Sequence, residues 1–356
     1  MEPAGHPVRM ELKSGNESRR WGWASMVSGA LLLALGAYFA VALTGRWTIL
    51  GELASQFRFS FGWGAAAVAV VVALTRRWRT AGLAAAFAIW GIWPEGTLAL
   101  KAPASAEAEL APSEELHVVV SNVLRPNTRY SEVFDVLLED DPDVVGLLEF
   151  NEEWRDAAFE RLDEDYPFHA TASNTVGWNE HSWALMLFSK TEITSSKELR
   201  LDFDDWELRP LLQATLAEPI ELTITLAHPE RPGRPARMRA RRTALERISQ
   251  CEVEGHWLVI GDLNSTSTSP LFRDILSKTG LRDSRAGFGR QPSWSFGDRL
   301  PGPLPLPLPS FAQLSVAIDH ALLSAGLDVL DRRTLSVPGS DHRAVSVTLR
   351  AAAGGP

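Results

Sequence analysis

Acidic, amide and imidazole side chains follow six apolar segments in the C-terminal part of this 356-residue sequence. The stretch "VIGDLNST" ends an apolar run with Asp262 and Asn264, two residue types that strands disfavour. The other segments end in, or are followed by, Asn122, Glu149, His228, the pair Asp319 and His320, and the run Ser340, Asp341 and His342. Because a rigid sheet holds the loops at its strand ends, six such endings on one sheet predict a functional site.

The residue types at these endings suit one kind of chemistry. Carboxylate and amide oxygens are hard ligands for Mg²⁺ or Mn²⁺. Histidines beside them can orient water and donate to phosphate oxygens. The sequence has no Cys/His cluster typical of zinc sites and no glycine-rich phosphate loop. The pattern therefore indicates a divalent-metal site that handles phosphate groups.

Several of these features have a second interpretation. Asn122 alone could form a turn, and Glu149 could cap the helix predicted after it. We expect His169, His181 and His256 to be ordinary, partly exposed histidines. The stretch "RPGRPARMRARR" is either an anionic-substrate or lipid-headgroup patch beside His228 or a solvated helix face. "PGPLPLPLP", residues 301–309, is either a stiff loop that shapes substrate access near Asp319 or a spacer.

Short apolar strands alternating with polar helices must position the candidate residues. The pattern predicts strands at residues 116–123, 143–150, 181–189, 211–218, 220–229, 256–264, 316–324 and 344–350. It predicts helices at residues 128–141, 152–165, 237–250 and 269–280. This is an α/β or α+β arrangement with much antiparallel sheet.

The first hundred residues have the composition of membrane helices. Residues 21–43 and 59–75 carry no charge, and residues 80–100 form a third candidate span with Glu95 at its far interface. Arginine and lysine gather in the N-terminal tail and in the connection "TRRWRT", which predicts that both are cytoplasmic. Three spans then place everything after residue 100 outside the cytoplasm.

Charge divides the chain in the same way. Residues 1–100 carry a net charge of +4, whereas the remainder carries −13, to give the overall −9. An acidic domain is poorly suited to gripping long nucleic acid through its phosphates. Residues 101–115 are rich in Ala, Pro and Glu and predict a linker. The single cysteine, Cys251, excludes an intrachain disulfide.

Taken together, the motifs resemble the endonuclease/exonuclease/phosphatase superfamily, which has the fold of pancreatic deoxyribonuclease. They stand here, in the family's order, as "SNVL", "DPDVVGLLEF", "LAHP", "GDLN", "AIDH" and "GSDHRAV". The resemblance covers about residues 115–350. It implies a four-layer αββα sandwich, here preceded by N-terminal transmembrane helices, and metal-dependent hydrolysis of phosphate esters. We expect a membrane-anchored type of this family, as in bacteria.

The resemblance also implies a role for each residue. The implied metal ligands are Asn122, Glu149 and Asp341, with Mg²⁺ or Mn²⁺ as the cofactor. The implied catalytic residues are Asp262, which orients or deprotonates water, Asn264, which holds that water or the transition-state oxygens, His228, which donates to a phosphate oxygen, and Asp319, which fixes the tautomer of His342 beside the scissile phosphate. The sequence departs from the family at Leu148, where glutamine is common.

These observations predict a membrane anchor at residues 1–100, a linker at 101–115 and a catalytic domain at 116–350. The expected function is a phosphodiesterase, nuclease or phosphatase in the cell (inner) membrane. Its substrate would be a lipid headgroup, a small phosphodiester or a nucleic acid, with no obligate protein partner. The alternative is a catalytically inactive phosphate-binding or interaction module on the membrane.

One geometric prediction is specific. We expect the Asp319 carboxylate within hydrogen-bond reach of one His342 ring nitrogen, with the other nitrogen facing the cavity that holds Glu149 and Asp262. Because Asp319 ends one strand and His342 precedes another, this contact predicts that the two strands are neighbours.

Overall fold

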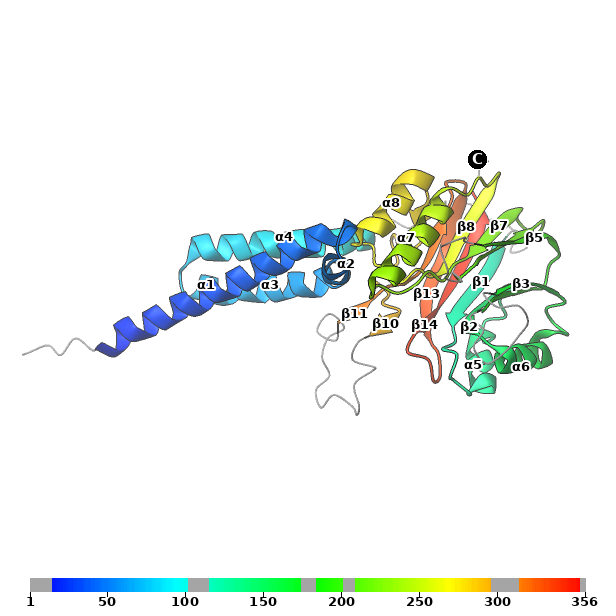
Figure 1. Cartoon of the computed structure of the whole chain (residues 1–356), viewed down its shortest axis with the longest axis horizontal. Coiled ribbons are helices and arrows are strands. Elements are labelled where there is room, and N and C mark those ends of the chain that lie inside the picture. Colours follow the sequence, from blue (N-terminus) through cyan, green and yellow to red (C-terminus); the bar gives the residue numbers. More distant parts are fainter. Residues whose placement is uncertain (1–14, 102–114, 174–183, 201–208, 296–313, 353–356) are drawn as a thin grey trace, which may run out of the picture.

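The computed structural model describes residues 15–101, 115–173, 184–200, 209–295 and 314–352. A bundle of long helices lies at one end of the molecule and a sandwich of two sheets at the other (Figure 1). The predicted linker falls almost entirely outside the described residues, as does the proline-rich stretch at 301–309.

Apolar helices form the N-terminal bundle. They are α1 (Gly15–Leu43), α2 (Ile49–Gln56), α3 (Arg58–Leu74) and α4 (Trp78–Leu100), with the 3₁₀ turn η1 (Thr44–Arg46) after α1. Two helical stretches, Ser25–Arg46 and Trp78–Leu100, are long and apolar enough to cross a membrane. Helices α2 and α3 meet at a bend of 66° and would make a third span if counted as one. Membrane crossing itself stays a prediction.

The bundle keeps its large apolar side chains on the outside and small residues at its contacts. Leu33, Val70, Leu74 and Ile89 are all more than half exposed. Helices α3 and α4 pack so closely that a Cβ atom added at Gly91 would lie 2.6 Å from the Cα atom of Gly62. Small residues at helix contacts with apolar side chains outward are typical of helices in lipid.

The C-terminal part contains two six-stranded mixed sheets. Sheet 1 has the order β13-β14-β1-β2-β4-β3, with β13 (Leu327–Ser336), β14 (Arg343–Ala351), β1 (Glu115–Asn122), β2 (Val144–Phe150), β4 (Ala184–Ser189) and β3 (Phe168–Ser173). Sheet 2 has the order β5-β6-β7-β8-β12-β9, with β5 (Ile193–Leu199), β6 (Leu211–Leu216), β7 (Leu222–Leu226), β8 (His256–Asp262), β12 (Asp319–Leu323) and β9 (Arg282–Asp283). The strands β10 (Trp294–Ser295) and β11 (Ser315–Val316) form a small separate ribbon.

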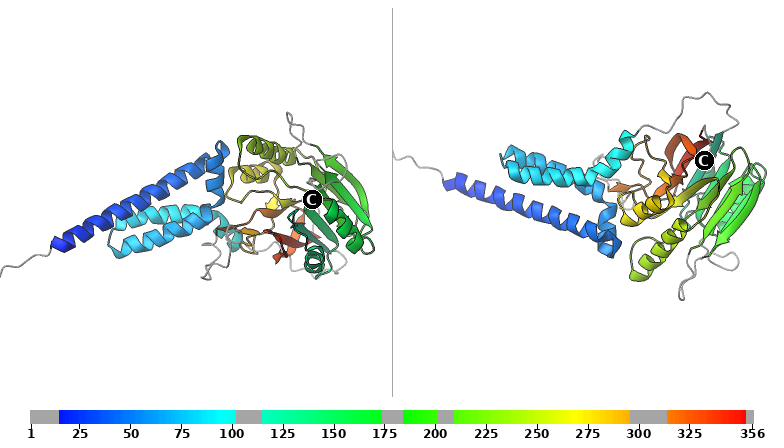
Figure 2. Two further views of the ribbon diagram at one scale, coloured as in Figure 1. Left: turned by 60° about the horizontal axis from the view of Figure 1, so that its bottom comes forward. Right: turned by 90° about the horizontal axis from the view of Figure 1, so that it is seen from above.

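The sheets and helices make four layers, so the predicted αββα sandwich is confirmed (Figures 1 and 2). Buried Val, Leu and Ile side chains, such as Val120, Leu226 and Ile260, fill the space between the sheets. Helices α5 (Tyr130–Leu137) and α6 (Glu152–Leu162) cover the outer face of sheet 1 through Phe134 and Trp154. Helices α7 (Pro235–Ser249) and α8 (Pro270–Thr279) cover sheet 2.

Besides the two-residue strands β9 and β10, three strands have no counterpart in the prediction, and all three are edge strands. β3 and β13 form the two edges of sheet 1, and β5 forms an edge of sheet 2. An edge strand has one partner and more exposed positions, so its apolar pattern is weak; β5, "ITSSKEL", has no buried residue. The predicted helix at 128–141 is also shorter, since it ends at Leu137 before Pro142.

Buried polar contacts join the bundle to the sandwich. Glu52 of α2 pairs with Arg241 of α7 at 2.8 Å, and neither side chain is exposed. Glu95 of α4 pairs with Arg285 at 3.1 Å. A buried charge is stable only when it is paired, so these contacts fix the bundle against the sandwich. Figure 1 shows α2 at the junction, beside the loops that lead into α8.

Candidate active site

The candidate residues gather where the ends of the two sheets face each other. Asn122, Glu149 and His342 belong to the ends of sheet 1, whereas His228, Asp262 and Asp319 belong to the ends of sheet 2. The prediction that all six lie on one sheet is therefore wrong. The sandwich brings two half-sites together across its layers, because both sheets present these strand ends at the same edge.

The backbone is distorted at two of the candidate residues, Glu149 and Asn264. The pairing of β2 with β4 shifts register between Leu148 and Phe150, so Glu149 lies at a bulge with a φ of 57°. Asn264, just after β8, has a φ of 48°. Positive φ angles at residues other than glycine store strain and concentrate at functional sites. Glu149 does not cap the following helix, since Asn151 accepts the N–H of Trp154 at that position.

Glycine is required just before the central carboxylate. Gly261 has a φ of 140°, and a Cβ atom there would lie 2.2 Å from the carbonyl oxygen of Ala227. Only glycine allows this conformation and this approach. The close contact brings the end of β8, with Asp262, beside the segment after β7 that carries His228.

A tight cluster forms the floor of the site. The Asn122 Nδ2 donates to Glu149 Oε1 at 3.1 Å and to Asp262 Oδ2 at 3.2 Å. The His228 Nε2 lies 3.6 Å from that Glu149 oxygen and 3.4 Å from that Asp262 oxygen. Asn122 also forms the turn that its sequence allowed, since its Oδ1 accepts the N–H of Leu124. Two carboxylates thus converge on one amide and one imidazole.

The predicted contact between Asp319 and His342 is present. The His342 Nδ1 lies 2.9 Å from Asp319 Oδ2, and its Nε2 lies 3.7 Å from Asp262 Oδ2, on the side of the cavity. The prediction that the two strands are neighbours is wrong in one respect. β12 and β14 belong to different sheets and face each other across the sandwich. Ser293 Oγ accepts the N–H of Asp319, which fixes the strand end behind the pair.

Neighbouring charges shift the pKa values of Asp262 and His342 in opposite directions. Burial favours the neutral form of Asp262, but the nearby His342 and His228 and its hydrogen bonds outweigh burial and hold its pKa well below the usual range. Burial likewise disfavours charge on His342, but the carboxylates of Asp319 and Asp262 outweigh it and raise its pKa to about 10. At neutral pH the site therefore holds an Asp262 carboxylate beside a His342 imidazolium.

Two sets of residues could hold a cation. Ligand atoms of Asp262, Asp319 and His342 all lie within 4.8 Å of one another. In that set, however, Asp319 and His342 are already joined to each other by a hydrogen bond. The oxygens of Glu149 and Asp262 share one amide donor and face the cavity, and two converging carboxylates are stabilised by a hard divalent cation. The residues present thus fit Mg²⁺ or Mn²⁺.

Asp341 and Asn264 line the same cavity but make further contacts. The Trp294 Nε1 donates to Asp341 Oδ2 at 3.1 Å. The Asn264 Nδ2 donates to the carbonyl oxygen of Pro229 at 3.0 Å and to Asp262 Oδ2 at 3.3 Å. The structure therefore brings all eight candidate residues to one place, and their individual roles stay predictions.

The cavity has a volume of about 570 Å³, and four arginines line it, two of which lie in the stretch "RPGRPARMRARR". Arg125, Arg209, Arg231 and Arg237 line it. Arg209 follows a segment without a motif, and its Nη1 lies 2.6 Å from His228 Nε2. The arginines of the stretch "RPGRPARMRARR" have different surroundings. Arg231 and Arg237 line the cavity. Arg241 is buried against Glu52, and Arg242 donates to the carbonyl oxygen of Arg46.

The bundle also contributes to this cavity. Leu53, Gln56 and Phe57 line it together with Trp294, Val316 and Ile318. The Gln56 side chain donates to the carbonyl oxygen of Asn264 at 3.0 Å and accepts the N–H of Thr266 at 3.0 Å. Sequence motifs could not have identified Leu53, Gln56 and Phe57, because these residues lie about 200 positions before the loop that Gln56 contacts.

His320 has a structural role and not a catalytic one. Its ring is fully buried, packs on Phe272 and lies 2.7 Å from the carbonyl oxygen of Ser265 through Nε2. Burial lowers its pKa to about 3, so the ring is neutral. Through this contact with Ser265, His320 supports the loop that follows Asn264.

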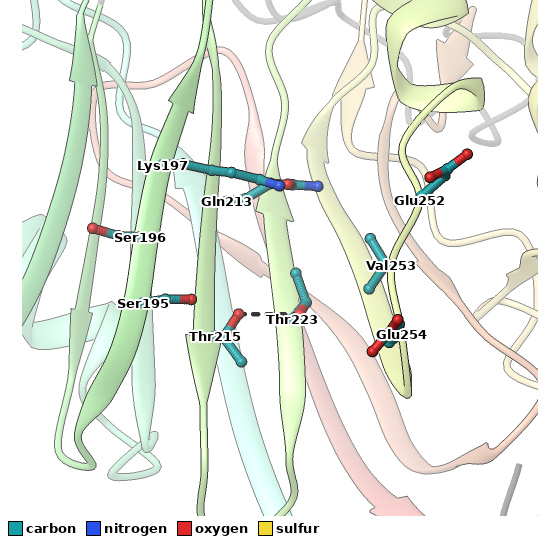
Figure 3. Close-up of a pocket in the computed structure, with 9 residues that line it drawn as sticks. All are labelled: Ser195, Ser196, Lys197, Gln213, Thr215, Thr223, Glu252, Val253 and Glu254. Carbon is teal, nitrogen blue, oxygen red and sulfur yellow. Dashed lines mark hydrogen bonds between the residues drawn. The ribbon is translucent and has the colours of Figure 1, made fainter.

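A second hollow, of about 230 Å³, lies on the outer face of sheet 2 (Figure 3). Gln213, Thr215 and Thr223 line it together with Lys197 and the segment 252–254. None of the residues predicted to do chemistry lines this hollow. The chemistry therefore belongs to the cavity at the facing sheet ends.

A two-sheet sandwich with carboxylate, amide and imidazole groups at one edge is a phosphoesterase fold. The chain belongs to the Endonuclease/Exonuclease/phosphatase family, whose model matches residues 119–342. A search of curated proteins found no match.

Solved structures share the fold at low sequence identity. The endonuclease/exonuclease/phosphatase from Beutenbergia cavernae is 17% identical, with a TM-score of 0.54 over 67% of this chain and 72% of that one. The protein of the same description from Bacteroides vulgatus is 17% identical, with a TM-score of 0.50 over 67% and 99%. A humanised TDP2 from D. rerio is 14% identical, with a TM-score of 0.50 over 67% and 100%.

Proposed function

We propose that this protein is a membrane-anchored, divalent-metal-dependent hydrolase of phosphate esters. In this proposal residues 1–100 are the anchor, 101–115 the linker and 116–350 the catalytic domain. Family membership supports the reaction class, because members of this family are metal-dependent phosphoesterases. The apolar helices support the anchor.

One observation carries the proposal. His228 Nε2 lies within 3.6 Å of both Glu149 Oε1 and Asp262 Oδ2, and His342 Nε2 lies 3.7 Å from the same Asp262 oxygen. One point in the cavity is therefore surrounded by carboxylates and imidazoles. The carboxylates can bind a cation and align water, and the two imidazoles can contact phosphate oxygens. A structural ion-pair network alone would not need a cavity beside it.

The chain's own groups divide the work of hydrolysis. A Mg²⁺ or Mn²⁺ held by Glu149, Asn122 and Asp341 would supply positive charge to the phosphate oxygens when bound. Asp262, with its low pKa, accepts a hydrogen bond from the attacking water and aligns it. His342, held by Asp319, and His228 donate to phosphoryl oxygens.

The atoms balance as in any ester hydrolysis. The water oxygen bonds to phosphorus while the bond from phosphorus to the leaving oxygen breaks. One proton of the water passes by way of Asp262 to solvent, and the leaving oxygen takes up a proton. The products are an alcohol and a phosphate that keeps the oxygen of the water.

Turnover of bis-p-nitrophenyl phosphate by the full-length protein in detergent tests the proposal. We expect p-nitrophenol release with Mn²⁺ and none after EDTA treatment. Glu149→Gln should lower both the rate and the apparent metal affinity. Full activity of Glu149→Ala in chelator would remove the metal from the mechanism. Tight phosphate binding without any turnover would favour the inactive binding module.

The proposed location is the cell membrane, with the catalytic domain outside the cytoplasm. Arg76, Arg77 and Arg79 in one connection, together with the basic N-terminal tail, support this orientation. Alkaline phosphatase fused after Leu110 should be active. An inactive fusion, with an active cytoplasmic reporter at the same point, would reverse the orientation.

A further inference from the structure

The wall of the catalytic cavity that faces the bundle is built by the anchor itself. Leu53, Gln56 and Phe57 of the anchor line this cavity, together with the apolar side chains of Trp294 and Ile318. The lining therefore combines apolar side chains, some of them from the bundle, with the carboxylates and imidazoles of the candidate site. Such a lining fits a substrate that has an apolar portion beside its phosphate.

Helix α2 has two unlike faces. Glu52, Ser55 and Gln56 are buried against the sandwich, with 0%, 2% and 6% of each residue exposed. Leu50 and Leu53 point outward, with 71% and 37% exposed. The preceding Trp47 is 75% exposed. A short helix with an apolar outer face and a neighbouring tryptophan is typical of a membrane interface.

The position of α2 agrees with this interpretation. It is bent by 66° from α3, so it lies across the end of the bundle and not along it (Figure 1). Its buried pair with Arg241 and the hydrogen bonds of Gln56 hold it in that place. In the proposed orientation, the cavity mouth beside Leu53 therefore opens at the outer surface of the membrane.

Charge in the cavity suits an anionic headgroup. Arg125, Arg209 and Arg231 line the cavity, and Arg209 also pairs with Glu230 at 3.2 Å. Arginine binds phosphate oxygens well because its planar donor group can contact two of them. Long nucleic acid fits less well, since residues 101–356 carry a net charge of −13 and binding of such a polymer depends on many phosphate contacts.

We propose that the substrate is the phosphate ester of a lipid, bound with its phosphate over Glu149 and Asp262 and its tail passing Leu53 into the outer leaflet. This inference rests on the proposed function. It adds that the anchor is a wall of the active site and selects substrates that lie in the membrane plane.

A pair of esters with the same scissile bond tests it. Dodecyl p-nitrophenyl phosphate and methyl p-nitrophenyl phosphate both release p-nitrophenol and differ only in the tail. With the full-length protein in phosphatidylcholine vesicles and Mn²⁺, we expect kcat/KM for the dodecyl ester to exceed that for the methyl ester by about 100-fold, as several buried methylene groups allow.

Partitioning of the dodecyl ester into vesicles raises its local concentration in every variant, so a matched pair on α2 is needed. Leu53→Gln should lower the dodecyl-to-methyl ratio about tenfold, because it removes the apolar side chain from the cavity wall. Leu50→Gln, on the same helix but outside the cavity, should leave that ratio unchanged.

The other possible outcomes each overturn the lipid inference, alone or together with the proposed function. Equal kcat/KM for the two esters, or equal ratios in the Leu53 and Leu50 variants, would overturn the lipid inference and leave the hydrolase intact. Faster cleavage of a single-stranded DNA oligonucleotide than of the dodecyl ester would assign the site to nucleic acid. No turnover of either ester would remove the proposed function and this inference together.

Discussion

The two halves of the active site are held in different ways. The half from sheet 1 is supported by the sandwich alone: Ser340 Oγ donates to the carbonyl oxygen of Asn122, and Asn122 donates to Glu149. The half that follows β8 is a loop, residues 264–269, which is supported largely by the bundle. Contacts to this loop come from Glu52, Gln56 and Glu95, and from the backbone of Ser55.

This difference predicts that part of the site in the sandwich depends on the bundle. Without the bundle, Arg241 and Arg285 would each lose a buried carboxylate partner, and the backbone of the loop at Asn264 and Thr266 would lose the Gln56 side chain. Arg241 would then have to be solvated by water, whereas Arg285 would keep its contact to Asp283 at 2.8 Å. The Asn264 loop should therefore be ordered only when the bundle is present, whereas Glu149 and Asn122 keep their geometry.

The largest expected effect concerns the joint between the two halves, Asp319 and His342. His342→Ala and Asp319→Ala should each lower kcat by roughly 10²–10⁴-fold, since they remove a fixed proton donor. The double variant should be little worse than the worse single variant, because the two act as a unit. Single-turnover kinetics measure this, and losses that multiply fully would mean that the residues work independently.

The next effect tests the dependence of the loop on the bundle. Arg241→Met leaves Glu52 buried and unpaired and should destabilise the junction by about 3–5 kcal/mol, with loss of activity on methyl p-nitrophenyl phosphate. Combining it with Glu52→Leu should restore most of the stability, since an apolar pair can replace a buried ion pair. Activity should stay low, because the loop still lacks the Arg241 donor to Asn264 and Ser265 and the Glu52 acceptor of Ser269. Thermal unfolding in detergent measures the stability. A double variant as unstable as Arg241→Met would contradict the ion-pair explanation.

A smaller effect isolates one contact. Gln56→Ala removes two hydrogen bonds to the loop and should lower kcat by up to about 30-fold, as two bonds of roughly 1 kcal/mol each predict. Ser55→Ala is the matched control, because the Ser55 hydroxyl bonds only within α2, to the carbonyl oxygen of Glu52. If Gln56→Ala raised KM alone, Gln56 would contact substrate and would not position the loop.

The smallest effect separates buried from exposed contacts at the same junction. Arg46 pairs with Asp274 at 2.5 Å, but the two side chains are 50% and 27% exposed. Such a pair contributes about 0–1 kcal/mol. Arg46→Ala should therefore change activity and melting temperature little, with a rate within about twofold of the parent protein. A loss as large as that of Arg241→Met would show that surface charge also holds the bundle in place.

The sequence predicted the sandwich and the half-sites because their residues follow strongly apolar central strands. Asp262 at the end of β8 and Glu149 near the end of β2 stand out for this reason. Edge strands β3, β5 and β13 lack that contrast and were missed. The assignment of all endings to one sheet failed because strand ends alone do not reveal which sheet a strand joins.

The contribution of α2 could not be predicted from motifs. Glu52 and Gln56 lie in a short polar connection between apolar segments, where polar residues are ordinary. Their partners, Arg241 and Asn264, are about 200 residues away, and only packing of the bundle on the sandwich brings them together. Glu95 was expected at a membrane interface; the structure pairs it with Arg285 of the sandwich, and its place in a membrane stays a prediction.

The length of α3 has a consequence for the lipids around the protein. Its 17 residues extend about 25 Å, which is less than the roughly 30 Å hydrocarbon core of a typical bilayer. In the proposed orientation, the bilayer must thin around the bundle or draw α2 inward. Acyl-chain length would then set how deeply the cavity mouth lies in the headgroup layer, so bilayer thickness becomes a variable that governs turnover of a membrane-borne ester.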